Sequence, residues 1–202
     1  MKKETIVVAS SNKGKIREIK EIFKDYDVLS IKDMEDILGK KIVVNENKDT
    51  FKENALEKVR DLYEQVGKKY ICIADDSGIS IDVLNGFPGV HTARWLDADD
   101  HFKNLELLKK VGKAAKEKRK CHYTTVIALK SKNVEETFEC VLSGIVGNNA
   151  RGENGFGFDE IFELPNGKTL AEISTLEKLK LSPRKEALDM LNKYLKKFKT
   201  EK

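Results

Sequence analysis

The stretch "IVVASSNKGKIREIKEIF", residues 6–23, constrains the fold more than any other part of this chain. Four apolar residues are followed by a polar segment with one glycine, and then by apolar residues at helical spacing: Ile16, Ile19, Ile22 and Phe23. A buried strand that leads into an amphipathic helix through a short polar turn is the repeating unit of α/β proteins. The opening of the chain therefore predicts a sheet flanked by helices.

The rest of the chain continues this alternation and predicts the α/β class throughout. A strand at 27–31 precedes a polar stretch, and a helix over 50–66 begins with a capping box of Thr50 and Glu53. The stretch "YICIADDSGISIDVL" is interpreted as two strands around an acidic turn. The remaining predicted elements are a helix over 99–111 with Phe102, Leu105 and Leu108 inward, strands near 121–129 and 137–146, and a final helix starting at Ser182-Pro183.

Length and composition limit the kinds of protein that this chain can be. Its 202 residues can bury one good core, so we expect a single domain over 1–202. No apolar run approaches the roughly 20 residues of a membrane helix, and no signal peptide is visible, since the first four residues lead straight into a strand. Cys72, Cys121 and Cys140 lack C-x-x-C spacing and indicate reduced thiols in the cytoplasm. Any metal would therefore be held by oxygen ligands.

The positive charge of the chain is concentrated in one run. The net charge is +4, and residues 109–120 hold seven basic side chains against the single acid Glu117. One interpretation is a nucleic-acid-binding patch. The other, which we favour, is a solvated helix end and loop, because the run has no aromatic residues on which bases would stack.

The polar turn after the first strand is suited to an anion. Unpaired N–H groups at a helix start carry partial positive charge, and Lys13 and Lys15 add full charges, so a phosphate is the expected ligand. The turn is not a Walker loop, because Ala9 stands where its first glycine belongs and Ile16 where its hydroxyl belongs. The alternative is an ordinary helix cap formed by Ser11 or Asn12.

The acidic motif "ADDSG" provides a second candidate site. We expect Asp75 and Asp76 at the end of an apolar strand, a common place for site residues in α/β sheets. Adjacent carboxylates suit Mg²⁺, and Asp is a competent general base. The alternative is an acidic turn that faces water. Together with the basic helix start, the pair suggests that the chain binds a magnesium-bound polyphosphate.

Five motifs resemble one known family. "SSNKGKIREI", "TFKENALEKV", "ADDSGISIDVLNGFPGVHTAR", "NGFGFDEIF" and "EKLKLSPRKEAL" occur in the order and rough spacing of the inosine triphosphate pyrophosphatase family. The resemblance implies an elongated mixed sheet flanked by helices, with two lobes and the nucleotide in the cleft between them. It also implies a homodimer that uses Mg²⁺, with Mn²⁺ as a substitute. The expected reaction is hydrolysis of deaminated purine triphosphates (ITP, dITP and XTP) to the monophosphate and pyrophosphate.

The resemblance also assigns residues to the phosphate and metal sites. Glu46 and Asp76 would bind the metal, with Asp76 also the catalytic base, Asp75 its helper and Ser77 touching the nucleotide. Residue 48, a glycine in the family, is lysine here. The residues matching the family's phosphate loop are Ser10, Ser11, Asn12, Lys13, Gly14 and Lys15.

The base pocket is implied to come from the second half of the chain. Phe156 would stack on the purine, with Lys178 and Arg184 as candidate donors to its carbonyl oxygen. The family's histidine before that arginine is Pro183 here, which removes a side-chain donor and a backbone N–H. The other residues of the implied base loop are Gly157, Phe158 and Asp159.

Two alternative functions remain open. The first is a related pyrophosphatase that prefers another modified base, such as a modified pyrimidine, because Pro183 lies in the region that selects the base. The second belongs to another class, a basic nucleic-acid-binding module that uses residues 109–120.

Overall fold

The computed structural model describes residues 3–200, with side chains described as far as residue 197, and its central feature is one six-stranded sheet. The strand order is β2-β1-β3-β4-β5-β6; β1 pairs in parallel with β2 and with β3, whereas β5 and β6 are antiparallel. The mixed sheet confirms the predicted α/β class. The strands are β1 (Thr5–Val8), β2 (Asp27–Ser30), β3 (Ile71–Ile81), β4 (Lys120–Lys130), β5 (Glu135–Val146) and β6 (Phe162–Glu163).

Six α-helices accompany this sheet among the described residues. Two of them, α2 and α5, were not predicted from the sequence, although each begins with a capping box, at Ser30 and at Ser174 respectively. The helices are α1 (Lys13–Ile22), α2 (Ile31–Leu38), α3 (Phe51–Val66), α4 (Asp100–Val111), α5 (Thr175–Leu181) and α6 (Pro183–Thr200).

The chain divides into two compact units. Within the described residues, the first unit is formed by the chain up to Asp76, by Thr125–Cys140 and by the chain from Arg184 onward, and the second by Ser77–Thr124 and Val141–Pro183. The strands β3, β4 and β5 contribute residues to both units.

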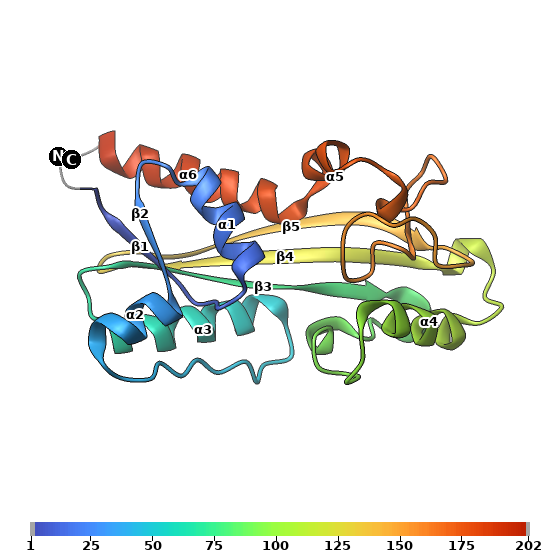
Figure 1. The fold of residues 1–202 in the computed structure, drawn as a ribbon, viewed down its shortest axis with the longest axis horizontal. Helices are drawn as coiled ribbons and strands as arrows, with labels where there is room; N and C mark the ends of the chain where they lie inside the picture. The colour runs from blue at the N-terminus through green and yellow to red at the C-terminus, as the bar shows by residue number, and fades with distance from the viewer. Residues whose placement is uncertain (1–2, 201–202) are drawn as a thin grey trace. The chain divides into compact units, whose positions relative to one another are not determined.

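The first unit has a hydrophobic core on each face of its part of the sheet. On one face, α1 and α6 pack together through Ile19, Leu188 and other apolar residues. On the other face, α2 and α3 contribute Met34 and Leu62 to a second core. Figure 1 shows α1 and α6 above the strands and α2 and α3 below them. The two helical layers explain why the strands in this unit read as nearly continuous apolar runs.

The second unit has its own core around α4. Leu107 and Val111 of this helix pack with Ile79, Ile81 and Phe162. The predicted inward face of α4 is wrong for Phe102 and Leu105, which are exposed, whereas Leu108 is partly buried and packs against this core. The buried residues of the helix are Asn104, Leu107 and Val111. The apolar residues occur on more than one side of this helix, so their spacing alone did not identify the buried face.

The most important difference from prediction concerns Asp75 and Asp76. They do not lie in a turn but inside the continuous strand β3, where they are 4% and 5% exposed. The expected acidic turn at the end of a strand, and its alternative facing water, are both wrong. Buried carboxylates require nearby cations or hydrogen-bond donors, and these come from distant parts of the sequence.

Two further expectations concern the cysteines and membrane helices. The three cysteines are free and buried, and burial raises the pKa of the Cys72 thiol to about 12. Between residues 3 and 200, we find no helix with the length and apolar character needed to cross a bilayer.

Candidate functional site

The predicted phosphate loop forms the start of α1. Asn12 caps the helix, and its Oδ1 accepts hydrogen bonds from the N–H groups of Gly14 at 2.9 Å and Lys15 at 3.1 Å. The Ser10 hydroxyl accepts a hydrogen bond from the Asn12 N–H at 3.1 Å. The capping interpretation is therefore confirmed for Asn12. Because the cap uses these two N–H groups, the lysine side chains supply the positive charge that the loop offers to an anion.

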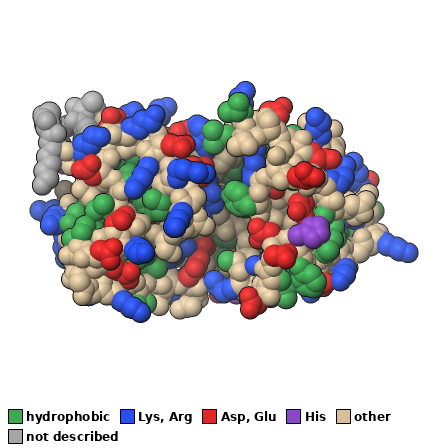
Figure 2. All heavy atoms as spheres, viewed as in Figure 1, with side chains coloured by type: hydrophobic (Ala, Val, Ile, Leu, Met, Phe, Trp, Pro, Cys, Tyr) green, Lys and Arg blue, Asp and Glu red, His purple; other side chains and the backbone are tan. Residues whose placement is uncertain are grey.

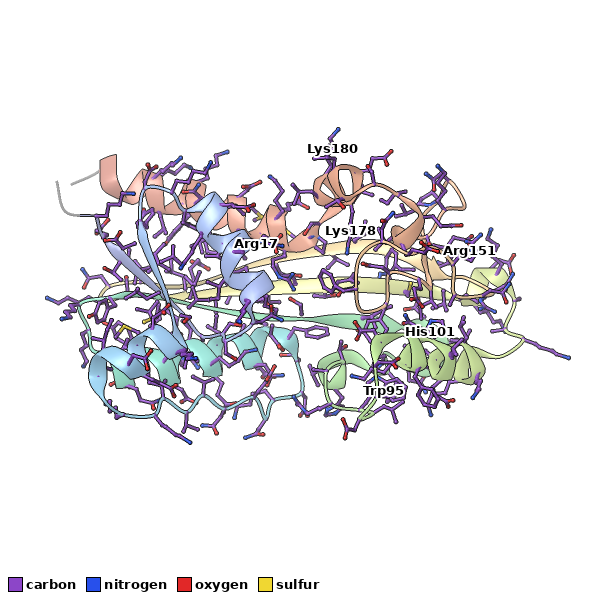
Figure 3. The ribbon with its side chains drawn as sticks, viewed as in Figure 1. Arg17, Trp95, His101, Arg151, Lys178 and Lys180 are labelled. Atoms are coloured by element: carbon purple, nitrogen blue, oxygen red, sulfur yellow. The ribbon has the colours of Figure 1, made fainter. Side chains whose placement is uncertain are left out.

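Lys13 and Lys15 have different surroundings. The Lys15 ammonium pairs with Asp75 of β3. Lys13 and Ser11 instead line an open pocket of about 560 Å³, together with Ile16, Arg17, Lys20, Glu21, Lys24, Ser30, Lys32 and Asp33. Figure 2 shows Lys and Arg side chains in blue gathered over α1, and Arg17 is labelled beside this helix in Figure 3. Of the two lysines in the loop, Lys15 is therefore the one that forms an ion pair with Asp75.

Asp75 forms an ion-pair cluster with α1 and α6. Its Oδ1 pairs with Lys15, and its Oδ2 accepts a hydrogen bond from the Arg184 Nε at 2.7 Å. A second nitrogen of Arg184 lies 3.4 Å from Glu18 Oε2. Burial would raise the pKa of Asp75, but Arg184 and Lys15 outweigh it and hold the pKa well below its ordinary value. Asp75 therefore stays ionised and holds the side chains of Lys15 and Arg184 in place.

Asp76 faces α3 instead. Successive side chains in a strand point to opposite faces, so the adjacent aspartates contact different helices. The Lys58 ammonium donates to Asp76 Oδ1 at 3.0 Å, to Glu46 Oε1 at 3.0 Å and to the Asp75 carbonyl at 2.7 Å. The pKa of Asp76 is raised to about 7, mainly by burial and further by the Glu46 carboxyl, against the opposing effect of Lys58. Asp76 Oδ2 is buried and has no hydrogen-bond partner among the described residues.

Glu46 lies in a segment without regular secondary structure that is held by one face of α3. The N–H groups on both sides of it are bound: that of Asn45 donates to Asp61 at 2.8 Å, and that of Asn47 donates to Glu57 at 3.1 Å. The N–H groups of Val43 and Lys48 likewise donate to Gln65 and Asn54 of this helix. The acceptors at 54, 57, 61 and 65 recur every three or four residues, the spacing of one helix face. The helix thus fixes the backbone that places Glu46 beside Lys58.

The side chain of residue 48 takes part in this arrangement. The Lys48 ammonium lies 3.2 Å from Glu57 Oε1, while the other oxygen of Glu57 accepts the Asn47 N–H. The lysine that replaces the family's glycine is therefore accommodated by Glu57.

The donor set around Asp76 fits a divalent cation. Two carboxylates face one ammonium, which leaves surplus negative charge, and Asp76 offers an unpartnered buried oxygen. Within the described residues no group of three or more Asp, Glu, His or Cys side chains is placed to hold a metal. A site of two carboxylates is consistent with Mg²⁺, which usually keeps several waters and takes further ligands from substrate phosphates.

Lys58 is a site residue that sequence reasoning missed. It lies on the buried side of α3, is only 7% exposed, and is flanked by the fully buried Ala55 and Val59. A lysine is rarely buried unless it is paired. A charged residue inside an otherwise apolar helical stripe was the available signal, but the sequence did not reveal its partners.

Three of the predicted base residues, Phe156, Asp159 and Lys178, form a cluster in the second unit. Asp159 accepts a hydrogen bond from the Phe156 N–H at 2.8 Å and pairs with Lys178, whose ammonium lies 4.2 Å from the centroid of the Phe156 ring. Burial raises the pKa of Asp159, although Lys178 partly opposes this. Phe156 is 61% exposed, whereas Phe158 is buried in the core and is not available for stacking. Figure 3 labels Lys178 and Lys180, which lie on opposite sides of α5.

The remaining predicted residues lie as follows. Ser77 follows Asp76 in β3 and is half-buried. Pro183 is the first residue of α6, as predicted, and places Arg184 in the first turn of that helix. Arg184 belongs to the first unit and contacts Asp75, whereas Lys178 belongs to the second unit. The two candidate base donors are thus found in different clusters.

Part of the basic run at 109–120 is structural. Arg119 is buried, and its guanidinium donates to the backbone carbonyls of Val146 at 2.7 Å, Gly112 at 3.2 Å and Gly147. Lys109 pairs with Glu106, and Lys116 lies 3.5 Å from Glu163. This distribution favours the solvated-surface interpretation of the run.

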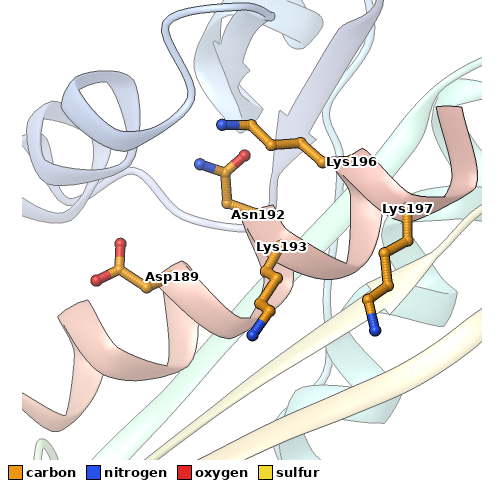
Figure 4. Close-up of a pocket in the computed structure, with 5 residues that line it drawn as sticks. All are labelled: Asp189, Asn192, Lys193, Lys196 and Lys197. Carbon is orange, nitrogen blue, oxygen red and sulfur yellow. The ribbon is translucent and has the colours of Figure 1, made fainter. Parts of the chain in front are cut away.

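A second open pocket lies along α6. It has a volume of about 520 Å³ and is lined by Asp189, Asn192, Lys193, Lys196 and Lys197 (Figure 4). None of these residues belongs to the clusters around Asp75, Asp76 or Phe156. We therefore assign no role to this pocket.

Known proteins resemble the chain over nearly its whole length. The Ham1 family profile matches residues 6–194. A dITP/XTP pyrophosphatase from Thermoanaerobacter sp. (strain X514) is 42% identical over 200 residues, which covers 98% of this chain and 99% of the relative. The solved Ham1 protein of Staphylococcus aureus has a TM-score of 0.86 at 34% identity and covers 96% of this chain and 98% of its own. A nucleoside-triphosphatase / dITP/XTP pyrophosphatase structure from Mycobacterium abscessus has a TM-score of 0.79 at 32% identity, with coverage of 93% and 98%. These full-length matches agree with the motifs at both ends of the sequence, and the chain therefore belongs to the Ham1 family.

Proposed function

We propose that this protein hydrolyses deaminated purine nucleoside triphosphates, namely ITP, dITP and XTP, to the nucleoside monophosphate and pyrophosphate. The observation that carries this proposal is that the two adjacent aspartates lie on opposite faces of the sheet and have different partners. Asp75 orders the cations Lys15 and Arg184 on one face of the sheet, while Asp76 stands beside Glu46 and Lys58 on the other. Hydrolysis of a polyphosphate requires cationic side chains that bind the phosphates. It also requires carboxylates that can hold Mg²⁺.

The phosphate groups are assigned to the cations. Lys15 keeps a quarter of its side chain exposed and has three ammonium donors, so it can bind a phosphate oxygen while it remains paired with Asp75. Arg184 supplies further guanidinium donors at the first turn of α6. The phosphate loop residues from Ser10 to Gly14 position Lys15 through the Asn12 cap.

Asp76 is assigned as the general base. Its unpartnered Oδ2 accepts a proton from water as the water oxygen forms a bond to phosphorus and the bond to the pyrophosphate leaving oxygen breaks. Glu46 and Asp76 would hold Mg²⁺, which when bound would neutralise charge on the phosphates. Lys58 keeps both carboxylates oriented through its three hydrogen bonds.

The base is assigned to the cluster around Phe156. The exposed ring offers an apolar face for stacking, and the Lys178 ammonium is a donor that matches the carbonyl oxygen of hypoxanthine and xanthine. Adenine presents an amino donor at the same position. A donor facing a donor leaves groups unsatisfied, which disfavours ATP. Since Arg184 contacts Asp75, Lys178 is the donor that we assign to the base.

One assay tests the proposal. Pyrophosphate release is measured with Mg²⁺ for ITP, XTP, GTP, ATP and dTTP on one preparation. We expect ITP and XTP to have kcat/KM on the order of 10²-fold above ATP, with GTP intermediate. Equal values for ITP and ATP would contradict the donor assignment, and a preference for dTTP would favour the alternative of a modified pyrimidine substrate.

Assembly and location are two further parts of the proposal. The family resemblance supports a homodimer, and light scattering coupled to gel filtration measures the mass. A function in the cytoplasm follows from the nucleotide substrate and agrees with three cysteines that form no disulfide. A fluorescent fusion observed in cells tests the location.

A further inference from the structure

The loop that carries Phe156 is held by two polar side chains of α4 to which the proposed function assigns no role. We infer that Asp100 and Asn104 are positioning residues for this loop and thereby set how tightly the base of the substrate is bound. The inference rests on the proposed function, because it takes Phe156 as the residue that contacts the base.

The two side chains bind the two backbone polar groups of the same residue, Gly157. Asp100 Oδ2 accepts a hydrogen bond from the Gly157 N–H at 2.7 Å, and Asn104 Nδ2 donates to the Gly157 carbonyl at 2.9 Å. They are four residues apart on α4 and therefore lie on the same side of the helix. Gly157 has a φ of 64°, a backbone conformation that residues other than glycine rarely adopt. The peptide groups on its two sides are therefore held in an unusual orientation.

The burial of Asn104 indicates that it does more than fill space. The residue is 0% exposed and lies on the same face of α4 as Leu107 and Val111. Its Oδ1 has no hydrogen-bond partner among the described residues. Burying an unsatisfied amide oxygen is unfavourable, and a leucine of similar volume would avoid it. The amide nitrogen compensates for this by donating to the Gly157 carbonyl at 2.9 Å and, over a longer distance, to Glu160 Oε2 at 3.4 Å.

The two hydrogen bonds that Asp100 and Asn104 make to Gly157, called the α4 clamp below, fix the backbone next to Phe156. The N–H of Phe156 donates to Asp159, and the N–H of the next residue donates to Asp100. Asp159 also occupies the place where a side chain at Gly155 would lie. Consecutive anchors leave the exposed ring on a rigid support, so little order has to be gained when a flat base stacks on it. Without the anchors from α4, binding would have to order the loop.

The experiment compares Asp100→Ala and Asn104→Leu with two controls. Asp100→Asn keeps an oxygen that accepts the Gly157 N–H, and Glu106→Ala removes a carboxylate from the same helix that contacts Lys109 instead. Hydrogen exchange in the substrate-free protein reports on the peptide that covers residues 155–158. Steady-state pyrophosphate release from ITP supplies KM and kcat.

We expect amide exchange at 155–158 to be about tenfold faster in Asp100→Ala and Asn104→Leu, with KM for ITP raised about tenfold and kcat changed less than about threefold. Both controls should resemble the wild type. Unchanged exchange in the first two variants would overturn the α4 clamp, and faster exchange with an unchanged KM would overturn its role in binding the base. If the wild type releases no pyrophosphate from ITP, the proposed function is wrong, and the exchange rates still decide whether α4 holds the loop.

Discussion

The Arg184 guanidinium donates to Asp75 at 2.7 Å, although the two residues are 109 positions apart in the sequence. This contact, together with the pairing of Asp75 with Lys15, distinguishes the two adjacent aspartates. Asp75 is neutralised by cations, while Asp76 shares one lysine with Glu46. The two carboxylates should therefore respond differently to the same substitution.

Asp75→Asn should mainly lower stability, and Asp76→Asn should mainly lower turnover. Removing one partner of a buried ion pair typically costs about 3 kcal/mol or more in the free energy of unfolding. Loss of a general base lowers kcat by at least ~10²-fold. Urea unfolding and steady-state kinetics on both variants measure the two effects. The assignment of roles is wrong if Asp76→Asn keeps near-wild-type turnover or if Asp75→Asn unfolds at the wild-type urea concentration.

The raised pKa of Asp76 predicts a pH dependence of stability in the metal-free protein. Its ordinary value is 3.8 and its folded value about 7, so the folded state holds the proton more tightly. The stabilising contribution is therefore complete below the unfolded pKa and is lost as the pH rises through about 7. Asp76→Asn removes this dependence. With EDTA present, the free energy of unfolding of the variant should increase relative to that of the wild type as the pH rises from 5 to 8. A difference that does not change with pH would contradict the raised pKa.

Activity should require Mg²⁺ or Mn²⁺, because the carboxylates of Glu46 and Asp76 are hard oxygen ligands. Excess EDTA should abolish pyrophosphate release, while circular dichroism should show an unchanged fold. Restoring Mg²⁺ should restore activity. Full activity in EDTA would exclude the proposed role of these carboxylates.

Glu57→Ala should weaken metal binding without touching the metal ligands themselves. Glu57 holds the Asn47 N–H and lies next to the Lys48 ammonium, so its loss frees the segment that carries Glu46. Loss of a group that orients a ligand typically costs about tenfold or more in metal affinity. Calorimetric titration with Mn²⁺ measures the change. Glu64→Ala, an exposed change on the same helix, is the control and should bind Mn²⁺ like the wild type.

Lys178→Ala should reduce the preference for ITP over ATP. The variant removes a donor to the base carbonyl, which is expected to change the ratio of kcat/KM by about tenfold. Lys180→Ala removes a lysine from the opposite side of the same helix and should leave the ratio unchanged (Figure 3). An equal ratio in both variants would mean that the base is read by another group.

Local sequence patterns predicted most of the fold. The start of α1, the Thr50 cap of α3 and the Pro183 start of α6 follow from spacing and cap residues, which act over one or two turns of chain. The family resemblance inferred from five motifs is confirmed by the full-length relatives. The helix α2 was missed because Ser30 and Asp33 form a capping box with aspartate in place of the usual glutamate.

The interior of the site was harder to predict, for a physical reason. The sequence "ADDSG" resembles a turn because charged residues are rarely buried in a strand. The cations that make this burial possible, Lys15, Lys58 and Arg184, come from three different helices. Only the folded chain brings them together. The same limit applies to Asp100 and Asn104, whose partner Gly157 is more than 50 residues away.

The environment of Lys58 also sets its behaviour toward chemical reagents. All three of its ammonium hydrogens are donated to oxygen atoms, and its side chain is only 9% exposed. An acylating reagent must reach the nitrogen from solvent, and these contacts block its approach. In a chain with 38 lysines and arginines, most of them at the surface, Lys58 should stay unlabelled until the protein unfolds. Its labelling by acetic anhydride, followed by mass spectrometry, would then report the opening of this part of the molecule.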